Sequence, residues 1–340
     1  MSDQVDPEVL LARAAEAGIH RLALPTPFAV GRINTYLIED DPLTLVDAGP
    51  NSGKALDELE QLLAERGHKV EDLELLVITH QHLDHLGLTN ILQRRSGADV
   101  AALEGLVPWA ADYSAAMEAE DAYAEHLMAR HGIPEDLRYA LRAVSYVFRG
   151  WGASATVTHP LTPGTTLDLR DRSLEISHRP GHSPSDTIFH DRERKILLSA
   201  DHLIERISSI ALLTPPMDDL NPAERPKPLL QYMESLAATR EMTDVELVLT
   251  GHGHPISDPV AIIDERFAMY DKRAGKIHRL LEKAGEPQSA YDLAQSMWGN
   301  VAVTQAYLTL SEVLGHIDIL VRDARVVEED DGEVVRYRVA

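Results

Sequence analysis

Hydrophobic residues recur along the chain at two spacings, and each spacing predicts a different kind of element. Three short apolar or alternating runs, separated by Pro, Gly and Asp, predict an opening β meander: 20–24, 34–38 and 43–46. A stripe of four leucines between residues 56 and 63 predicts an amphipathic helix that ends near Gly67. The run 73–79 is almost entirely apolar, which is typical of a strand buried on both faces.

Helices and strands continue to alternate through most of the chain. Asp6-Pro7 predicts the start of a helix over 8–17, and a second helix is expected over 90–95. Further strands are predicted from apolar runs: 99–103, 173–177, 187–190, 195–199 and 246–250. This alternation favours an α/β fold with mixed sheets.

Residues 105–152 interrupt the alternation. The segment lacks strand periodicity, and it contains seven of the chain's 17 aromatic residues (3 Trp, 10 Tyr and 4 Phe in all). We therefore predict an inserted helical cap.

A second change occurs after a helix expected over about 258–284. Gly285-Glu286-Pro287 breaks the chain, and helices over 289–298 and 303–322 are expected to follow it. A hairpin over 326–339 would turn at Asp330-Asp331-Gly332. These elements predict a small winged-helix-like C-terminal domain over 285–340, after a catalytic domain over 1–284 that includes the cap.

Composition narrows the range of functions. The chain has 32 Lys and Arg against 55 Asp and Glu, a net charge of −23, which argues against nucleic-acid and anionic membrane partners. Since there is no cysteine, disulfides, thiolate metal ligands and cysteine nucleophiles are excluded. No apolar run reaches the roughly 18 residues that a membrane span needs, and residues 1–9 lack the basic and apolar regions typical of a signal peptide. We expect a soluble cytoplasmic protein.

A cluster of histidines follows the buried run 73–79. It reads Thr79-His80-Gln81-His82-Leu83-Asp84-His85. A turn that leaves a strand can direct His80 and His82 at one cation and Asp84 and His85 at a second one. Imidazole and carboxylate together suit zinc, with iron and manganese as alternatives.

This cluster resembles the HxHxDH motif of the metallo-β-lactamase-fold hydrolases. Three further segments resemble later motifs of that family, in the same order: Pro180-Gly181-His182-Ser183-Pro184, Ser199-Ala200-Asp201-His202 and Thr250-Gly251-His252-Gly253-His254-Pro255. The matching motifs span about residues 20–257. Ala200 stands where the family commonly has glycine, and Leu86-Gly87-Leu88 where many members have a glycine pair, but neither departure removes a ligand.

The resemblance implies an αββα sandwich that holds two divalent metal ions, most often Zn²⁺. It assigns His80, His82 and His182 to the first ion, Asp84, His85 and His252 to the second, and Asp201 to both. His254 remains an alternative to His252. His178 and His202 are expected to hold ligands in place rather than bind metal, and Asp47 is expected to orient a ligand.

Two such ions would convert a bridging water into a hydroxide nucleophile, and Asp84 would act as the catalytic residue by orienting it and passing on a proton. We predict hydrolysis of an ester, lactone or thioester bond in a small, partly hydrophobic substrate. The cap's aromatic residues, with Met117 and Met128, would form an apolar wall over the metals. Alternatively, those aromatic residues pack the cap itself or a homodimer interface.

Two other activities remain open for the same motif. One is a nucleic-acid-cleaving phosphodiesterase, which the acidic hairpin disfavours because Glu328, Glu329 and Asp331 would repel phosphate. The predicted C-terminal domain is therefore expected to pack or dimerise rather than bind DNA. The other is a single-iron persulfide dioxygenase.

Overall fold

Two β-sheets form the centre of the protein in the computed structural model, which describes residues 5–340. The first sheet follows the chain order: β1 (Ile19–Leu24), β2 (Ile33–Ile38), β3 (Thr44–Val46), β4 (Leu75–Ile78), β5 (Asp99–Leu103) and β6 (His159–Leu161). The second has the order β11 (Leu247–Thr250), β10 (Ile196–Ala200), β9 (Thr187–Asp191), β8 (Ser173–His178) and β7 (Thr166–Asp168). Both sheets are mixed, since β3 to β6 and the β10–β11 pair are parallel and the remaining pairs are antiparallel.

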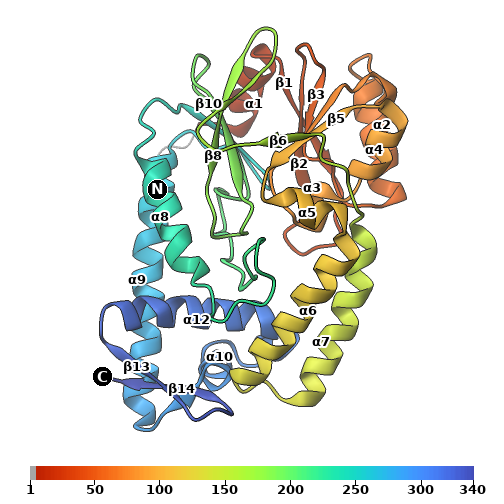
Figure 1. Cartoon of the computed structure of the whole chain (residues 1–340). Coiled ribbons are helices and arrows are strands. Elements are labelled where there is room, and N and C mark those ends of the chain that lie inside the picture. The colour runs from red at the N-terminus through yellow and green to blue at the C-terminus, as the bar shows by residue number, and fades with distance from the viewer. Residues whose placement is uncertain (1–4) are drawn as a thin grey trace.

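The sheets pack against each other and are covered by helices on their outer faces. Val77 and Ala101 of the first sheet share a core with Phe189, Leu198 and Leu249 of the second. A second core joins the first sheet to α2 (Gly53–Ala64) and α4 (Thr89–Ser96), and a third joins the second sheet to α8 (Pro228–Arg240) and α9 (Pro259–Ala284). In Figure 1, α2 and α4 lie to the right of the sheets, and α8 and α9 lie to the left. The expected α/β class with mixed sheets is confirmed.

Local sequence explains where several elements begin and end. The side chain of Asp6 accepts the backbone N–H of Glu8 at 2.9 Å and caps α1 (Pro7–Glu16), which has proline in its first turn. Ser52 caps α2 in the same way. Every residue of β4 is buried, as its apolar sequence predicted. A 3₁₀ turn (Val70–Asp72) leads from α2 toward β4.

The segment after β5 is helical, as expected. It forms α5 (Leu106–Ala111), α6 (Tyr113–Arg130) and α7 (Glu135–Phe148), followed by a 3₁₀ turn (Arg149–Trp151). In Figure 1, α6 and α7 run from the sheets down to the C-terminal helices. Three of its seven aromatic residues pack in two cores, Trp109 and Tyr113 in that of the first sheet and Tyr123 in that of the C-terminal helices, whereas Tyr139 and Tyr146 are exposed.

A small antiparallel sheet and three helices form the C-terminal part. The helices are α10 (Ala290–Trp298), α11 (Val301–Thr304) and α12 (Ala306–Arg322), and the sheet has the order β12 (Gln288–Ser289), β14 (Val335–Val339) and β13 (Val326–Asp330). Helix α12 packs against α8, α9 and α10, and it shares one core with Leu197 and Val248 of the second sheet. Among the helices of residues 5–340, none is both long and apolar enough to cross a bilayer.

Candidate metal centre

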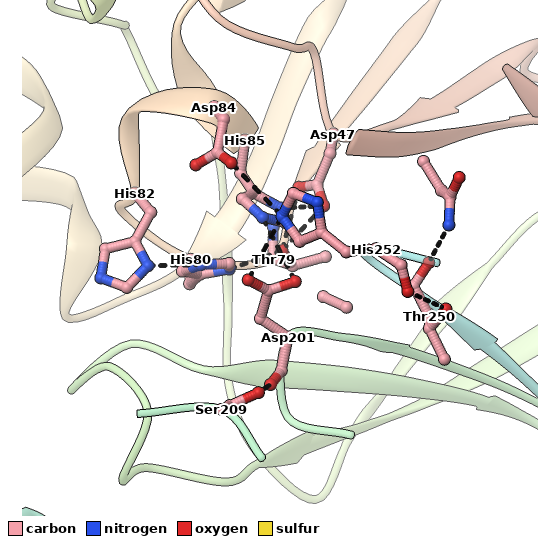
Figure 2. A network of polar contacts seen from close by, with 12 residues as sticks. Asp47, Thr79, His80, His82, Asp84, His85, Asp201, Ser209, Thr250 and His252 are labelled. Atoms are coloured by element: carbon pink, nitrogen blue, oxygen red, sulfur yellow. Dashed lines mark hydrogen bonds and ion pairs between the residues drawn. The ribbon is translucent and has the colours of Figure 1, made fainter. Parts of the chain in front are cut away.

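Four loops place the predicted ligands at one edge of the two sheets. His80 and His82 leave the end of β4, and the single-turn helix α3 (Leu83–Leu86) carries Asp84 and His85. The other three ligands come from the second sheet: His182 lies between β8 and β9, Asp201 follows β10, and His252 follows β11. Figure 2 shows Asp201 facing the histidines of the first sheet.

The side chains converge in three groups whose donor atoms lie within 4.8 Å of one another. The groups are His80–His82–His182, His80–His85–Asp201 and Asp84–His85–His252. His82 Nδ1 lies 3.0 Å from the Nε2 atoms of both His80 and His182. Asp201 lies between the groups, because its carboxylate oxygens are 3.5 Å from Nε2 of His85 and of His252 and 3.6 Å from Nε2 of His182. All seven residues assigned by the resemblance are thus brought together.

Hydrogen bonds orient four of the imidazole rings. The Nδ1 atom of His182 donates to the carbonyl oxygen of Ile210, and that of His252 to the carbonyl oxygen of Arg32, both at 2.9 Å. His85 Nδ1 donates to Asp47 Oδ2 at 2.7 Å, and His80 Nδ1 donates to Thr79 Oγ1 at 3.0 Å. A proton on Nδ1 leaves the Nε2 lone pair free to bind a metal ion.

Several of the converging atoms are buried without a hydrogen-bond partner among the described residues. They are Nε2 of His85, Nε2 of His252 and Oδ1 of Asp201. Leaving such groups unsatisfied costs about 1–3 kcal/mol each, so these clusters need an occupant. Because the donors are imidazole nitrogens and carboxylate oxygens, the residues fit zinc, iron or manganese ions.

The charges of the cluster also suit a cation. Burial alone would raise the pKa of Asp201, but the neighbouring His252 and His85 outweigh it and hold that pKa well below its ordinary value. The pKa of Asp84 is lowered in the same way, mainly by the neighbouring His252, whose Nε2 lies 3.3 Å from Asp84 Oδ2. Burial lowers the pKa of His82 to about 3. The carboxylates are therefore ionised and His82 is neutral at pH 7, which are the protonation states that bind metal.

Asp47 and Thr79 form hydrogen bonds that orient two of the candidate ligands, His80 and His85. Asp47 accepts the backbone N–H and the hydroxyl of Thr79, both at 3.0 Å from Oδ1, in addition to the bond from His85. The Thr79 hydroxyl in turn accepts from His80, so one carboxylate orients histidines of two different groups. Asp47 has φ of 60°, a left-handed conformation that Asp and Asn adopt more readily than most residues. The structure thus gives Asp47 the orienting position expected from the sequence, whereas the contribution of Thr79 was not anticipated.

Close packing explains two glycines of the motifs. A Cβ atom on Gly251 would lie 2.2 Å from Asp201 Oδ1, and one on Gly181 would lie 2.2 Å from the Cβ of Tyr232. Gly181 also has φ of 145°, which L side chains rarely adopt. Both positions therefore require glycine, Gly251 so that its loop can approach Asp201 and Gly181 so that the His182 loop can approach α8.

The other histidines near the motifs lie outside the three groups. His202 Nε2 contacts Thr239 Oγ1 at 2.8 Å, and His178 Nε2 donates to the carbonyl oxygen of Pro184 at 2.8 Å. His254 is absent from the groups, and its carbonyl oxygen accepts a hydrogen bond from the Thr250 hydroxyl at 3.1 Å. The geometry therefore favours His252 as the ligand from this loop.

A cavity of about 790 Å³ opens onto the centre. Its lining includes the candidate ligands His82, Asp84, His182, Asp201 and His252. The remaining lining comes mainly from residues 204–212, α9, α11 and α12, and none of it comes from residues 105–152. The expected cap wall is therefore wrong: Met128 is buried in the core shared with the C-terminal helices, and Met117 packs with the core of the first sheet.

Known proteins share both the sequence pattern and the architecture. The family model described as "Metallo-beta-lactamase superfamily" matches residues 29–252, a range that contains all seven converging residues. The chain belongs to this superfamily. Among its members, the probable metallo-hydrolase YqjP of Bacillus subtilis (strain 168) is 30% identical over 319 residues, which cover 93% of this chain and 96% of that one.

Two solved structures of the superfamily have the same fold over nearly the whole chain. A beta-lactamase domain protein from Burkholderia ambifaria has a TM-score of 0.79 at 26% identity, covering 95% of this chain and 92% of that one. A metallo-beta-lactamase family protein from Thermus thermophilus has a TM-score of 0.77 at 24% identity, covering 95% and 99%. The similarity to both includes the C-terminal helices and small sheet, since residues 29–252 alone would cover much less of this chain.

Proposed function

We propose that this protein is a binuclear metal-dependent hydrolase that cleaves an ester, lactone or thioester bond in a small, partly hydrophobic molecule. The observation that carries the proposal is the convergence of seven His and Asp side chains, five of which line one cavity. His80, His82 and His182 would hold the first ion, Asp84, His85 and His252 the second, and Asp201 would bridge them. Seven donors in two groups exceed what a single iron needs, which disfavours the dioxygenase alternative.

Bound divalent ions, with Zn²⁺ the best match to these donors, supply an activated water at neutral pH and polarise the bond under attack. The protein contributes orientation and proton transfer. Asp84 lines the cavity, and its Oδ2 is fixed 3.3 Å from His252 Nε2. Since its lowered pKa keeps it ionised, Asp84 is suited to orient the nucleophile, accept its proton and pass that proton to the leaving group.

The charges of the molecule favour a small substrate over nucleic acid. The net charge is −23, and β13 adds Glu328, Glu329 and Asp330 to one edge of the C-terminal sheet. This surface would repel the phosphate backbone of a nucleic acid, because protein–nucleic acid binding depends on neutralising phosphates with Lys and Arg. A cavity of about 790 Å³ is within the range that holds a small organic ligand.

Metal analysis combined with a substrate panel tests the proposal. The protein, loaded with Zn²⁺ and then with Mn²⁺ or Fe²⁺, is assayed on an aryl ester, an acyl-homoserine lactone and an acyl thioester, with a DNA oligonucleotide as a fourth substrate. We expect two ions per chain and turnover of at least one carbonyl substrate that is lost on chelation and regained on adding metal. Two bound ions without turnover of any carbonyl substrate, or cleavage of the oligonucleotide alone, would refute the carbonyl-hydrolase proposal.

A further inference from the structure

Apart from the candidate metal ligands, the cavity wall is predominantly apolar. It brings together Ile204 and Ile210 from the loop after Asp201, Met269 from α9, Trp298 from the end of α10, and Val301 and Leu308 from the α11–α12 region. These side chains come from segments up to about a hundred residues apart, and they face the same space as the candidate metal ligands.

The apolar lining continues to the mouth of the cavity. Val30, Ile207 and Val301 all line it, and they are 39%, 47% and 45% exposed, so they rank among the most exposed large hydrophobic residues of the protein. Isolated exposed aliphatic residues are ordinary, but three around one opening form an apolar entrance. A substrate that carries a hydrocarbon chain would cover them.

The charged groups of this wall are already engaged by the protein. Arg273 donates to Glu312 at 2.6 Å, and Arg206 donates to Glu205 at 3.1 Å. Arg266, which is buried, donates to the carbonyl oxygens of Ile204 and Glu205 at 3.1 and 2.8 Å. Apolar contact is therefore the main interaction that the wall offers to a ligand.

Hydrogen bonds to α9 and α12 hold the loop after Asp201, which forms part of the wall, in place. The Ser208 hydroxyl and the Tyr270 hydroxyl are 2.8 Å apart, and the Tyr307 hydroxyl donates to the carbonyl oxygen of Leu213. Ser209 donates to the carbonyl oxygen of Asp201, which ties the same loop to the metal centre. A wall fixed in this way is formed before the substrate arrives, so little binding energy is lost in ordering it.

We infer that this wall is an acyl-chain subsite, and that the substrates are carbonyl compounds whose acyl portion is a medium-length or long aliphatic chain. The inference rests on the proposed hydrolase function. The carbonyl would lie at the metal centre, and the chain would extend along Ile204, Met269 and Leu308 toward the mouth at Val301. Selectivity for chain length would then depend on the C-terminal helices and not on the cap.

A homologous series of aryl esters, from acetyl to dodecanoyl, tests the inference on the metal-loaded protein. Each buried methylene should raise kcat/KM about fourfold until the subsite is filled, the factor equivalent to about 0.8 kcal/mol. A kcat/KM that is flat or falls from acetyl to octanoyl would overturn the acyl-chain subsite while leaving the hydrolase function intact. No hydrolysis of any ester, with two metals bound, would instead overturn the hydrolase function itself.

A matched pair of variants locates the subsite. Val301→Trp places a large ring at the mouth of the cavity, whereas Val303→Trp adds the same ring to a similarly exposed position of α11 (38%) that does not line the cavity. We expect Val301→Trp to lower the ratio of decanoyl to acetyl kcat/KM at least tenfold, and Val303→Trp to leave it within twofold. Equal decanoyl-to-acetyl ratios in the two variants would show that the acyl chain of the substrate does not pass Val301.

A second variant guards against a folding defect in the first. Ile207→Asn lies on the exposed loop and removes apolar surface without adding bulk. It should reduce the gain in kcat/KM per methylene for the longest chains, with thermal unfolding unchanged. An unchanged chain-length profile in Ile207→Asn would also count against the subsite.

Discussion

Replacing Asp47 by Asn changes the hydrogen bonding beneath the metal centre while keeping the shape of the side chain. Asp47 is buried and accepts from Thr79 at Oδ1 and from His85 Nδ1 at Oδ2, so both oxygens act as acceptors. Asparagine has only one such oxygen. Whichever way the amide turns, its NH₂ group faces a donor, either the His85 ring or the backbone N–H of Thr79. Asn also tolerates the left-handed backbone at this position, so backbone strain does not confound the result.

The expected effect falls on metal affinity. If the amide NH₂ faces His85, the imidazole is driven to the tautomer with its proton on Nε2, the atom that points at the metal site. Loss of such a supporting partner typically costs 10–100-fold in metal affinity, or about 1.4–2.7 kcal/mol. Competition between the metal-free protein and a chromophoric chelator for Zn²⁺ measures both dissociation constants. We expect the weaker of the two sites to lose affinity by that factor and activity to fall with it.

Asp40→Asn is the matched control. Asp40 is also buried and accepts from Arg172 Nε at 3.1 Å, but it lies outside the candidate ligand groups. This variant should lose stability without losing metal affinity. If Asp47→Asn folds and keeps both zinc dissociation constants within twofold of the parent protein, Asp47 does not control the tautomer of His85.

Three further predictions concern ligation and stability. His82→Ala and Asp201→Ala should each abolish activity and reduce the metal content below two ions per chain, because each removes a donor of the candidate centre; full two-metal binding in either variant, measured by elemental analysis, would break the assignment. Burial lowers the pKa of His131 to about 3, so the unfolded chain takes up a proton first as the pH falls below about 6.5, and the free energy of unfolding decreases down to about pH 3. Between pH 7 and pH 5, His131→Phe should therefore lose about 2 kcal/mol less of its free energy of unfolding in urea than the parent protein loses. An identical pH dependence in the two proteins would contradict this. Asp318→Ala should cost about 3–5 kcal/mol because it leaves the largely buried Arg225 unpaired, whereas the exposed pair of Glu329 should contribute less than about 1 kcal/mol; equal losses in Asp318→Ala and Glu329→Ala would refute the distinction.

The convergence of the candidate ligands could be predicted from the sequence because the information is local. His80, His82, Asp84 and His85 lie within six consecutive positions that begin shortly after a strand, and the other three ligands also follow strands or lie in tight turns between them. A motif of this kind specifies both the residue types and the edge of the sheet where they meet. The expectations for β4, α1 and α9 succeeded for a similar reason, since their apolar runs, caps and stop signals lie within the elements themselves.

The cavity wall could not be predicted in the same way. Residues 204–212 have no regular structure, and α12 is buried on nearly every face, so its sequence indicates burial without showing which side faces the cavity. The strands β6 and β7 were missed because each is short and buries only one residue, so neither contains an apolar run. Helix α8 was missed because its buried face mixes apolar with polar residues, so it leaves no apolar periodicity in the sequence: Pro228, Leu229, Tyr232, Ser235, Leu236 and Thr239. In each case tertiary packing, rather than local pattern, decides the outcome.

The contacts between the loop after Asp201 and α12 have a consequence for the order of assembly during synthesis. All the candidate ligands precede residue 253, so they leave the ribosome before α12 is made. Until then Leu213 lacks its partners on α12, the Tyr307 hydroxyl and Ser311 Oγ. Because folding proceeds from the N-terminal side as the chain emerges, the candidate metal ligands are present before the side of the cavity that α12 forms can close. The nascent chain thus passes through a stage in which its candidate metal ligands are open to solvent on the side that α12 later covers.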